Sequence, residues 1–235
     1  MTLINKMLRI AGKDHFEIDK RVGSGYIFRL CWKYGWMMLR GKMVSLGYAN
    51  IAKDIFIGRN VRLYEKKHLS VGAKVKLHEN VKIDALSVNG VKIGNCVTIG
   101  RNTVIECTGG LQHIGKGICI ADNTSFGNDC FFGAAGGIEI GEDVVAGQYI
   151  RFHSENHNYN DLKELIKMQG VTHKGIKIGN NCWIGSGAVF LDGASIGNGC
   201  VVAANAVINK KFGDNVIIGG VPAKVIGYRG EKLDG

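Results

Sequence analysis

Two histidines, His153 and His157, lie close together in the polar stretch RFHSENHNYNDLKELIKMQGVTHKG, which begins at Arg151. The ordinary pKa of histidine lies near neutrality, so its imidazole suits the removal of a proton at physiological pH. A hydroxyl group that loses its proton in this way becomes a nucleophile. His153 and His157 are therefore the candidate catalytic residues, and the other five histidines lack this context.

The seven cysteines show no spacing typical of a metal site. Their number is odd, no CxxC pair occurs, and the first twelve residues contain no apolar run followed by a small-residue cleavage site. We therefore expect free thiols in a reducing cytoplasm, and we assign no metal ligand. A zinc site would need three histidines, and the trio to weigh is His113, His153 and His157.

These histidines interrupt a six-residue repeat that begins at about Ile57. Each unit starts with an aliphatic or Phe residue, glycine usually follows, two polar residues come next, and a small or β-branched residue takes the fifth place. Examples are IGNCV at Ile93, IGEDV at Ile140 and IGNNC at Ile178. Sixteen units fit, and they start at residues 57, 71, 77, 93, 99, 114, 120, 126, 132, 140, 146, 178, 184, 190, 196 and 202.

A six-residue period fits neither an α-helix nor a plain β-strand, so it predicts a short strand followed by a sharp turn. The first and fifth side chains would point inward, and Gly and Asn would supply the backbone angles of the turns. Three units would make one coil, and coils would stack roughly 4.8 Å apart through parallel strand pairing. Three cysteines take the fifth place and are expected in the core: Cys130, Cys182 and Cys200.

The composition supports this reading and excludes other classes. The chain has 235 residues with 35 Gly but one Pro, and 46% of its residues are apolar, which excludes a disordered or collagen-like chain. The formal charge of +10 is uneven: residues 1–82 carry 17 Lys and Arg against 6 Asp and Glu, and residues 83–235 carry 13 against 14. This split argues against a nucleic-acid binder.

The repeat resembles that of the hexapeptide-repeat transferases, whose fold is a left-handed parallel β-helix. Residues 178–226, IGNNCWIGSGAVFLDGASIGNGCVVAANAVINKKFGDNVIIGGVPAKVI, are similar to the C-terminal signature of the acetyltransferase branch. The sub-group that they resemble most is the bacterial polysaccharide and lipopolysaccharide O-acetyltransferases. The resemblance covers residues 57–226 and implies that a homotrimer transfers an acetyl group from acetyl-CoA to a sugar hydroxyl, with each active site between neighbouring subunits.

The resemblance also implies roles for single residues. In the related acetyltransferases a histidine of an extended loop is the general base, which favours His157 over His153. The alternative is that His157 only forms hydrogen bonds within its loop. Trp183 and Ser186 stand on the units that line the pantetheine groove of the relatives, although Trp183 would equally suit an apolar contact between subunits.

Three further residues are implied in donor binding. Ala204 stands in the next coil, where a small side chain lets the cofactor approach. Lys210 and Lys224 would face the phosphates of coenzyme A, or would simply be solvated. Two positions depart from the family's pattern, because Asn205 stands where Gly is usual and Asn209 where Thr is common.

The ends of the chain are predicted to differ from the repeat. We expect a basic, helical segment over residues 1–50, a mainly β domain over 51–226 with an extended loop at 153–177, and a tail at 227–235. A short helix is expected around residues 162–168. The N-terminal segment mixes basic residues with Trp and Phe at helical spacing, so it would either lie on an anionic membrane surface or cap the first coil.

Other functions remain to be weighed against acetyl transfer to a glycan. The acceptor could instead be a small molecule or a nucleotide sugar. A zinc-dependent hydratase of the γ-carbonic-anhydrase type uses the same fold, but the C-terminal signature argues against it. A non-catalytic scaffold is disfavoured by the loop histidine. We expect a cytoplasmic protein, at or away from the inner face of the membrane.

Overall fold

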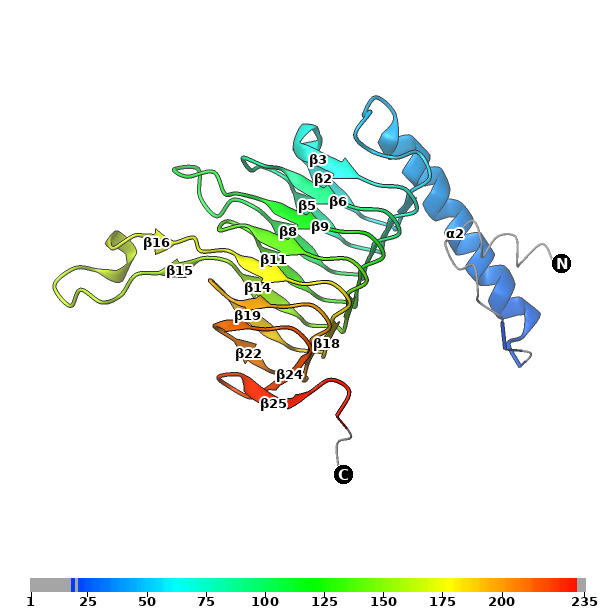
Figure 1. The fold of residues 1–235 in the computed structure, drawn as a ribbon. Coiled ribbons are helices and arrows are strands. Elements are labelled where there is room, and N and C mark those ends of the chain that lie inside the picture. The colour runs from blue at the N-terminus through cyan, green and yellow to red at the C-terminus, as the bar shows by residue number, and fades with distance from the viewer. Residues whose placement is uncertain (1–17, 20, 232–235) are drawn as a thin grey trace.

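The chain winds around a triangular prism whose three walls are parallel β-sheets (Figure 1). This computed structural model describes residues 18–19 and 21–231, so the N-terminal part of the predicted helical segment lies outside the described residues. Successive strands occupy the three walls in turn, and each strand pairs with the strand one coil later. Within the described residues, the predicted mainly β fold with a helix in the N-terminal segment and one long loop is confirmed.

The walls are called sheets 1, 2 and 3 in the order in which the chain visits them. Sheet 1 contains β1 (Phe56–Ile57), β4 (Lys76–Leu77), β7 (Thr98–Ile99), β10 (Ser125–Phe126), β13 (Val145–Ala146), β18 (Trp183–Ile184), β21 (Val201–Val202), β24 (Val216–Gly219) and the antiparallel β25 (Lys224–Tyr228). Sheet 2 contains β2 (Arg62–Tyr64), β5 (Lys82–Asp84), β8 (Val104–Glu106), β11 (Phe131–Gly133), β14 (Arg151–His153), β19 (Val189–Leu191) and β22 (Val207–Ile208). Sheet 3 contains β3 (Leu69–Val71), β6 (Val91–Ile93), β9 (Ile118–Ile120), β12 (Ile138–Ile140), β17 (Ile176–Ile178), β20 (Ser195–Ile196) and β23 (Lys211–Phe212).

The core is a set of stacked side chains along the prism axis. In sheet 2, Phe132, Phe152 and Phe190 are in register, and both pairs of neighbouring rings stack with centroids 4.9 Å apart. That spacing is the roughly 4.8 Å distance between paired strands. Cys130, Cys182 and Cys200 are buried, as predicted. Burial raises the pKa of the Cys182 thiol to about 11, so this thiol is protonated at neutral pH.

Two places in each unit have special backbone requirements, and they differ from each other. The fourth place of the units adopts the left-handed conformation, as at Asn60, Asn102 and Gly187. The second-place glycines are needed for close stacking instead, because a Cβ on Gly100 would lie 2.1 Å from the carbonyl oxygen of Gly127 in the next coil. The fourth-place side chains form a ladder in which each amide donates to the next coil: Asn60 to Asn80, Asn80 to Asn102 and Asn102 to Asp129.

Two excursions leave the prism at the edge where the chain passes from sheet 2 to sheet 3 (Figure 1). The shorter one covers residues 107–117. It contains Ile114, whose side chain is 51% exposed, so the repeat unit predicted to start there is wrong. The longer one covers residues 154–175 and forms a hairpin of β15 (Asn156–His157) and β16 (Val171–Thr172). Its predicted short helix is reduced to the 3-10 helix η2 (Ile166–Met168), and a second 3-10 helix, η1 (Lys66–His68), follows β2.

The helix α2 (Ser24–Ser45) packs against the first coil through its C-terminal half. Met37 is buried, and a Cβ on Gly41 would lie 2.0 Å from the carbonyl oxygen of Ile55, so only glycine permits this approach. The ring of Tyr34 meets that of Phe56 edge to face at 5.9 Å. In the part of the chain that the structure describes, we find no helix whose length and apolar content would let it span a membrane.

Candidate active site

His157 is carried outside the prism on the hairpin. The chain follows β14 to its end at His153, leaves sheet 2, and pairs His157 with Val171 across the two short antiparallel strands. The side chain of His157 is exposed to solvent. Its position therefore depends on how firmly the two ends of the hairpin are held against the prism.

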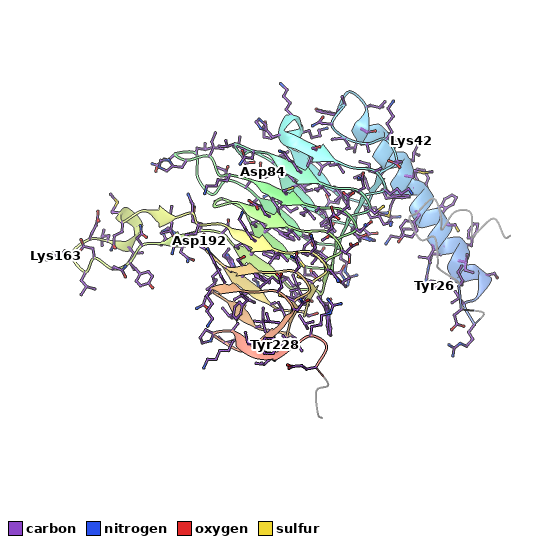
Figure 2. All side chains as sticks on the ribbon, viewed as in Figure 1. Tyr26, Lys42, Asp84, Lys163, Asp192 and Tyr228 are labelled. Carbon is purple, nitrogen blue, oxygen red and sulfur yellow. The ribbon has the colours of Figure 1, made fainter. Side chains whose placement is uncertain are left out.

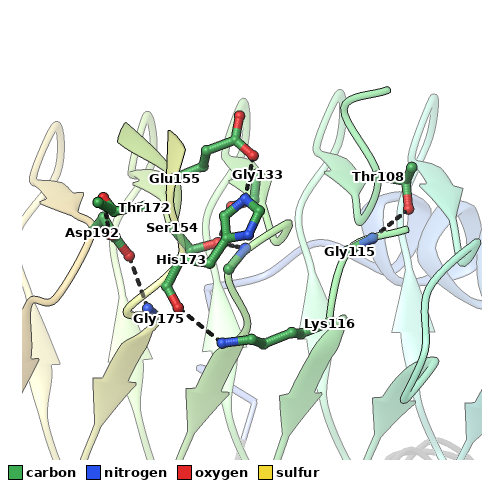
Figure 3. A network of polar contacts seen from close by, with 11 residues as sticks. Thr108, Gly115, Lys116, Gly133, Ser154, Glu155, Thr172, His173, Gly175 and Asp192 are labelled. Carbon is green, nitrogen blue, oxygen red and sulfur yellow. Dashed lines mark hydrogen bonds and ion pairs between the residues drawn. The ribbon is translucent and has the colours of Figure 1, made fainter. Parts of the chain in front are cut away.

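Asp192 holds one end of the hairpin, and in Figure 2 it lies at the root of the hairpin with Lys163 at the tip. It belongs to the turn after β19, and its side chain is only 6% exposed. One carboxylate oxygen accepts a hydrogen bond from the Thr172 hydroxyl at 2.8 Å, and the other accepts one from the Gly175 amide at 2.8 Å (Figure 3). Charge-assisted bonds of this kind are strong, so the returning strand is fixed to the neighbouring coil.

The outgoing end is joined to the returning end by a short polar contact between His173 and Glu155. The Nε2 atom of His173 lies 2.5 Å from a carboxylate oxygen of Glu155, across the neck of the hairpin (Figure 3). The ammonium group of Lys116 donates to the carbonyl oxygen of His173 at 2.8 Å. Lys116 belongs to the shorter excursion, so the two excursions are connected.

Ser154 begins the hairpin and is fully buried. Its hydroxyl donates to the carbonyl oxygen of Gly133 at 2.7 Å and accepts from the amide of Gly136 at 2.9 Å. The hydroxyl thereby satisfies two backbone groups of the preceding coil where the chain turns away. With Asp192, Glu155, His173 and Lys116 it forms the base cluster of the hairpin.

His153 lies in the wall of the prism. It pairs in register with Gly133 and Leu191 in sheet 2, so the excursion begins one residue later than the predicted loop. Its ring is half-buried and lies 5.6 Å from that of Phe131. Burial lowers the pKa of His153, and the neighbouring Arg151 charge lowers it further, which favours the neutral imidazole.

Most of the residues predicted to bind the donor gather on another side of the prism. Trp183 stands on the outer face of sheet 1 and is exposed. Ser186 and Ala204 occupy successive turns at the edge where sheet 1 passes to sheet 2, and the amide of Asn205 donates to the carbonyl oxygen of Ser186 at 2.9 Å. Asn205 has φ of 58°, so it adopts the left-handed conformation that asparagine and glycine accept more readily than other residues.

The two predicted lysines lie apart from each other. Lys224 begins β25 and pairs with Gly219, so it extends sheet 1 on the side of Trp183. Lys210 lies at the edge between sheets 2 and 3, and its ammonium group stands 5.5 Å from the centre of the Phe212 ring. Sheet 2 therefore separates His157 and Lys210, at one of its edges, from Ser186 and Ala204 at the other.

A groove of about 890 Å³ runs along the outer face of sheet 3 beside the base of the hairpin. Four lysines line it: Lys92, Lys116, Lys174 and Lys177. Lys177 forms an ion pair with Glu139 at 2.8 Å, and Lys116 donates to the hairpin. Ammonium groups at this density suit an anionic ligand such as a phosphate or a carboxylate.

The base cluster was missed in the sequence because nothing local marks it. Asp192 stands at the third place of a repeat unit, where polar side chains are usually exposed, and it is buried only because the hairpin folds over it. The sequence does contain a weak signal, because an acidic residue, Glu155, and a basic residue type, His173, stand near the two ends of the interruption.

The three histidines weighed for zinc, His113, His153 and His157, do not form a cluster. Among the described residues, no three His, Cys, Asp or Glu side chains lie together as they would around a metal ion.

Known proteins resemble the chain in sequence. Residues 175–210 match the family described as bacterial transferase hexapeptide (six repeats). The chain is 31% identical to a probable acetyltransferase of Mycobacterium tuberculosis, over 69% of this chain and 52% of that protein. It is 30% identical to galactoside O-acetyltransferase of Escherichia coli, over 55% of this chain and 62% of that protein. A putative lipopolysaccharide biosynthesis O-acetyl transferase of Escherichia coli, WbbJ, is 27% identical over 49% of this chain and 63% of its own length. The chain thus spans 52 to 63% of the length of these relatives.

Solved structures resemble it in fold. A variant of AntD, an N-acyltransferase from Bacillus cereus in complex with dTDP-4-amino-4,6-dideoxyglucose and coenzyme A, has a TM-score of 0.52 at 16% identity, over 83% of this chain and 91% of that chain. This likeness bears on the fold alone and agrees with the left-handed parallel β-helix that the repeat predicts.

Proposed function

We propose that the chain is a hexapeptide-repeat acetyltransferase that transfers an acetyl group from acetyl-CoA to the hydroxyl of a sugar. The match of residues 175–210 to the hexapeptide family and the similarity to two relatives named as O-acetyltransferases support this proposal. The observation that carries the proposal is the placement of His157 on a hairpin that leaves the repeat and is fixed at its base by the buried Asp192. A histidine held in this way can meet a substrate that approaches from outside the prism.

His157 acts as the general base. Its imidazole takes the proton of the sugar hydroxyl while the oxygen attacks the thioester carbon of acetyl-CoA, which gives a tetrahedral oxyanion. Collapse of that intermediate breaks the carbon–sulfur bond, and the thiolate of coenzyme A leaves with the proton that His157 returns. No acyl-enzyme forms. His153 is the second choice as base, and its neutral form is favoured by burial.

A homotrimer would complete the site. His157 lies beyond one edge of sheet 2, and Ser186 and Ala204 lie at the opposite edge, so one chain does not bring the base to the proposed pantetheine groove. The hairpin of a neighbouring copy can supply the histidine. Its outer part exposes apolar side chains that suit burial against protein: Tyr159, Leu162, Leu165, Ile166 and Met168.

The donor would lie along Trp183, Ser186 and Ala204, with its phosphates near Lys224. Lys210, at the opposite edge of sheet 2, would reach the phosphates only from a neighbouring copy. For the acceptor we propose a surface polysaccharide or its lipid-linked precursor, presented at the inner face of the cytoplasmic membrane. The named activities of the galactoside and lipopolysaccharide relatives support a sugar hydroxyl. A nucleotide sugar is the second candidate, and the lysine-lined groove favours acceptors that carry phosphate.

The test is a screen for release of coenzyme A thiol from acetyl-CoA, with neutral saccharides, glycan fragments, nucleotide sugars and amino sugars as acceptors. We expect turnover with a hydroxyl acceptor and its loss in His157→Ala, while calorimetry shows that coenzyme A still binds. Full activity of His157→Ala would remove the assignment of the base. If only amino sugars are turned over, the attacking atom is nitrogen rather than oxygen, and the proposed O-acetyl transfer is wrong.

A further inference from the structure

Helix α2 presents two opposite faces. One face, with Tyr34, Met37, Gly41 and Ser45, packs on the first coil. The other carries large apolar side chains that are 45 to 74% exposed and recur every three or four residues: Phe28, Trp32, Trp36, Leu39, Met43 and the C-cap residue Leu46. At roughly 100° per residue these six form one stripe along the helix, which we call the aromatic stripe.

The aromatic rings of the stripe are ordered against each other. Phe28 stacks on Trp32 with ring centroids 6.4 Å apart, and Trp32 meets Trp36 edge to face at 5.9 Å. Single exposed apolar side chains are common on protein surfaces, but six of them in one continuous stripe mark an interaction site. Figure 2 places Tyr26 and Lys42 toward opposite ends of α2, and the helix extends away from the prism toward Tyr26.

The charges around the stripe are of one sign. Helix α2 contains Arg29, Lys33, Arg40 and Lys42 and no acidic residue. Lys33 pairs with Glu79 at 2.9 Å and Arg40 donates to the carbonyl oxygen of Ile57, so these two secure the helix to the prism. Arg29 and Lys42 are exposed at the flanks of the stripe. Residues 21–82 as a whole carry 13 Lys and Arg against 3 Asp and Glu.

From this pairing of an aromatic stripe with one-signed charge, we propose that α2 docks on an anionic lipid surface, with its axis in the plane of the membrane and the stripe at the boundary between headgroups and acyl chains. Tryptophan prefers that boundary, and lysine and arginine are attracted to anionic headgroups. A second copy of the chain is a poorer occupant, because it would bring the same cationic flanks together.

This inference deepens the proposed function, because it places the enzyme where a lipid-linked acceptor is presented. It rests on the proposed function for the reason why the protein would bind a membrane, but the binding itself does not depend on that function. Binding to vesicles does not require turnover, and turnover with a soluble acceptor does not require vesicles, so the two can fail separately.

The experiment is flotation of the full chain with vesicles of phosphatidylethanolamine and phosphatidylglycerol, compared with pure phosphatidylcholine. We expect binding to the anionic vesicles that weakens as salt rises. The triple variant Phe28→Ser, Trp32→Ser and Trp36→Ser should lower the partition coefficient at least about tenfold. The matched control is Val88→Ser with Leu111→Ser, which removes exposed apolar side chains from a turn of the prism and from the shorter excursion and should bind like the unchanged protein.

A charge variant separates the two contributions. Arg29→Gln with Lys42→Gln should weaken binding at low salt and have little effect at high salt, where the headgroup charges are screened. The triple variant should keep its solubility and its turnover of a soluble acceptor, which shows that it is folded. Equal binding of the triple variant and the unchanged protein would overturn the inference. So would a fall in oligomeric mass in the triple variant, because the stripe would then face another copy.

Discussion

Two excursions leave the prism at the same edge, yet only the longer one is anchored by a buried carboxylate. Residues 107–117 are held by backbone hydrogen bonds that residues 115–117 form with the neighbouring coils. The Thr108 hydroxyl adds two more, because it donates to the carbonyl oxygen of Leu86 and accepts from the amide of Gly115. The tip of this excursion exposes Leu111 and His113. The hairpin at 154–175 is held by the base cluster, which includes a buried carboxylate and the His173–Glu155 contact.

The difference is that a charged side chain is buried at the base of the hairpin. A buried carboxylate is costly unless its oxygens are bonded, and both oxygens of Asp192 are bonded to the hairpin. The short excursion has no comparable group among the described residues. A histidine on the anchored excursion, His157, has a defined position relative to the prism, as a general base requires, whereas His113 at the tip of the short excursion lacks such support.

The largest effect is expected when the histidine of the hairpin is replaced by alanine, and the histidine of the shorter excursion provides the comparison. His157→Ala should lower kcat about 10²- to 10⁴-fold, the usual contribution of a general base. His113→Ala should leave kcat within about twofold, because no substrate group is placed at that tip. Steady-state release of coenzyme A measures both. A comparable loss in the two variants would remove the functional distinction between the excursions.

The anchor itself comes next. Asp192→Ala leaves the Thr172 hydroxyl and the Gly175 amide without their acceptor, which should lower the free energy of unfolding by about 2 kcal/mol. Because the hairpin then shifts, kcat should fall about tenfold while the Kd of coenzyme A stays unchanged. Thr108→Val is the counterpart on the short excursion, and it should cost about 1 kcal/mol with kcat unchanged. An Asp192→Ala enzyme with unchanged kcat would show that the anchor has no role in positioning His157.

The titration of His153, in the wall from which the hairpin leaves, gives a smaller effect. Burial and Arg151 lower the pKa of His153 in the folded chain, so the unfolded chain binds its proton at higher pH. The free energy of unfolding should therefore have its full value above about pH 6.5 and fall as the pH drops below that value. Urea titrations of His153→Gln should show a weaker fall between pH 7.5 and 5.

The control for this titration is the unchanged protein, measured under the same conditions. His78, whose pKa is lowered by burial and by Lys33, leaves a residual slope in both proteins. A His153→Gln protein with the same slope as the unchanged protein would contradict the assignment.

Much of the prism could be predicted because its contacts repeat. Each first-place side chain meets its equivalent one coil away, so a six-residue pattern is enough to place Phe132, Phe152 and Phe190 on one inner face. The pattern failed at Ile114, where an insertion imitates the repeat without completing a strand. It also left open which place supplies the left-handed turn, because glycine serves both for tight stacking and for positive φ.

The hairpin could be located from the sequence but its anchors could not. An interruption in a repeat is visible in one dimension, whereas Lys116 meets His173 across 57 positions and Asp192 meets Thr172 across 20. Such contacts depend on how the insertion folds back over the wall, and no local period encodes that. For the same reason His153 was assigned to the loop, although its backbone stays in register with Gly133.

The smallest effect is expected where the two excursions meet. Lys116→Met removes the hydrogen bond to the carbonyl oxygen of His173, an exposed contact worth about 0.5 kcal/mol, and kcat should stay within about twofold. Amide hydrogen exchange in residues 171–175 should nevertheless become faster, because the returning strand loses one of its holds. Lys92→Met is the matched control, since Lys92 lines the same groove without a hydrogen bond to the hairpin. If both variants accelerate exchange equally, the charge of the groove, rather than the link between the excursions, steadies the hairpin.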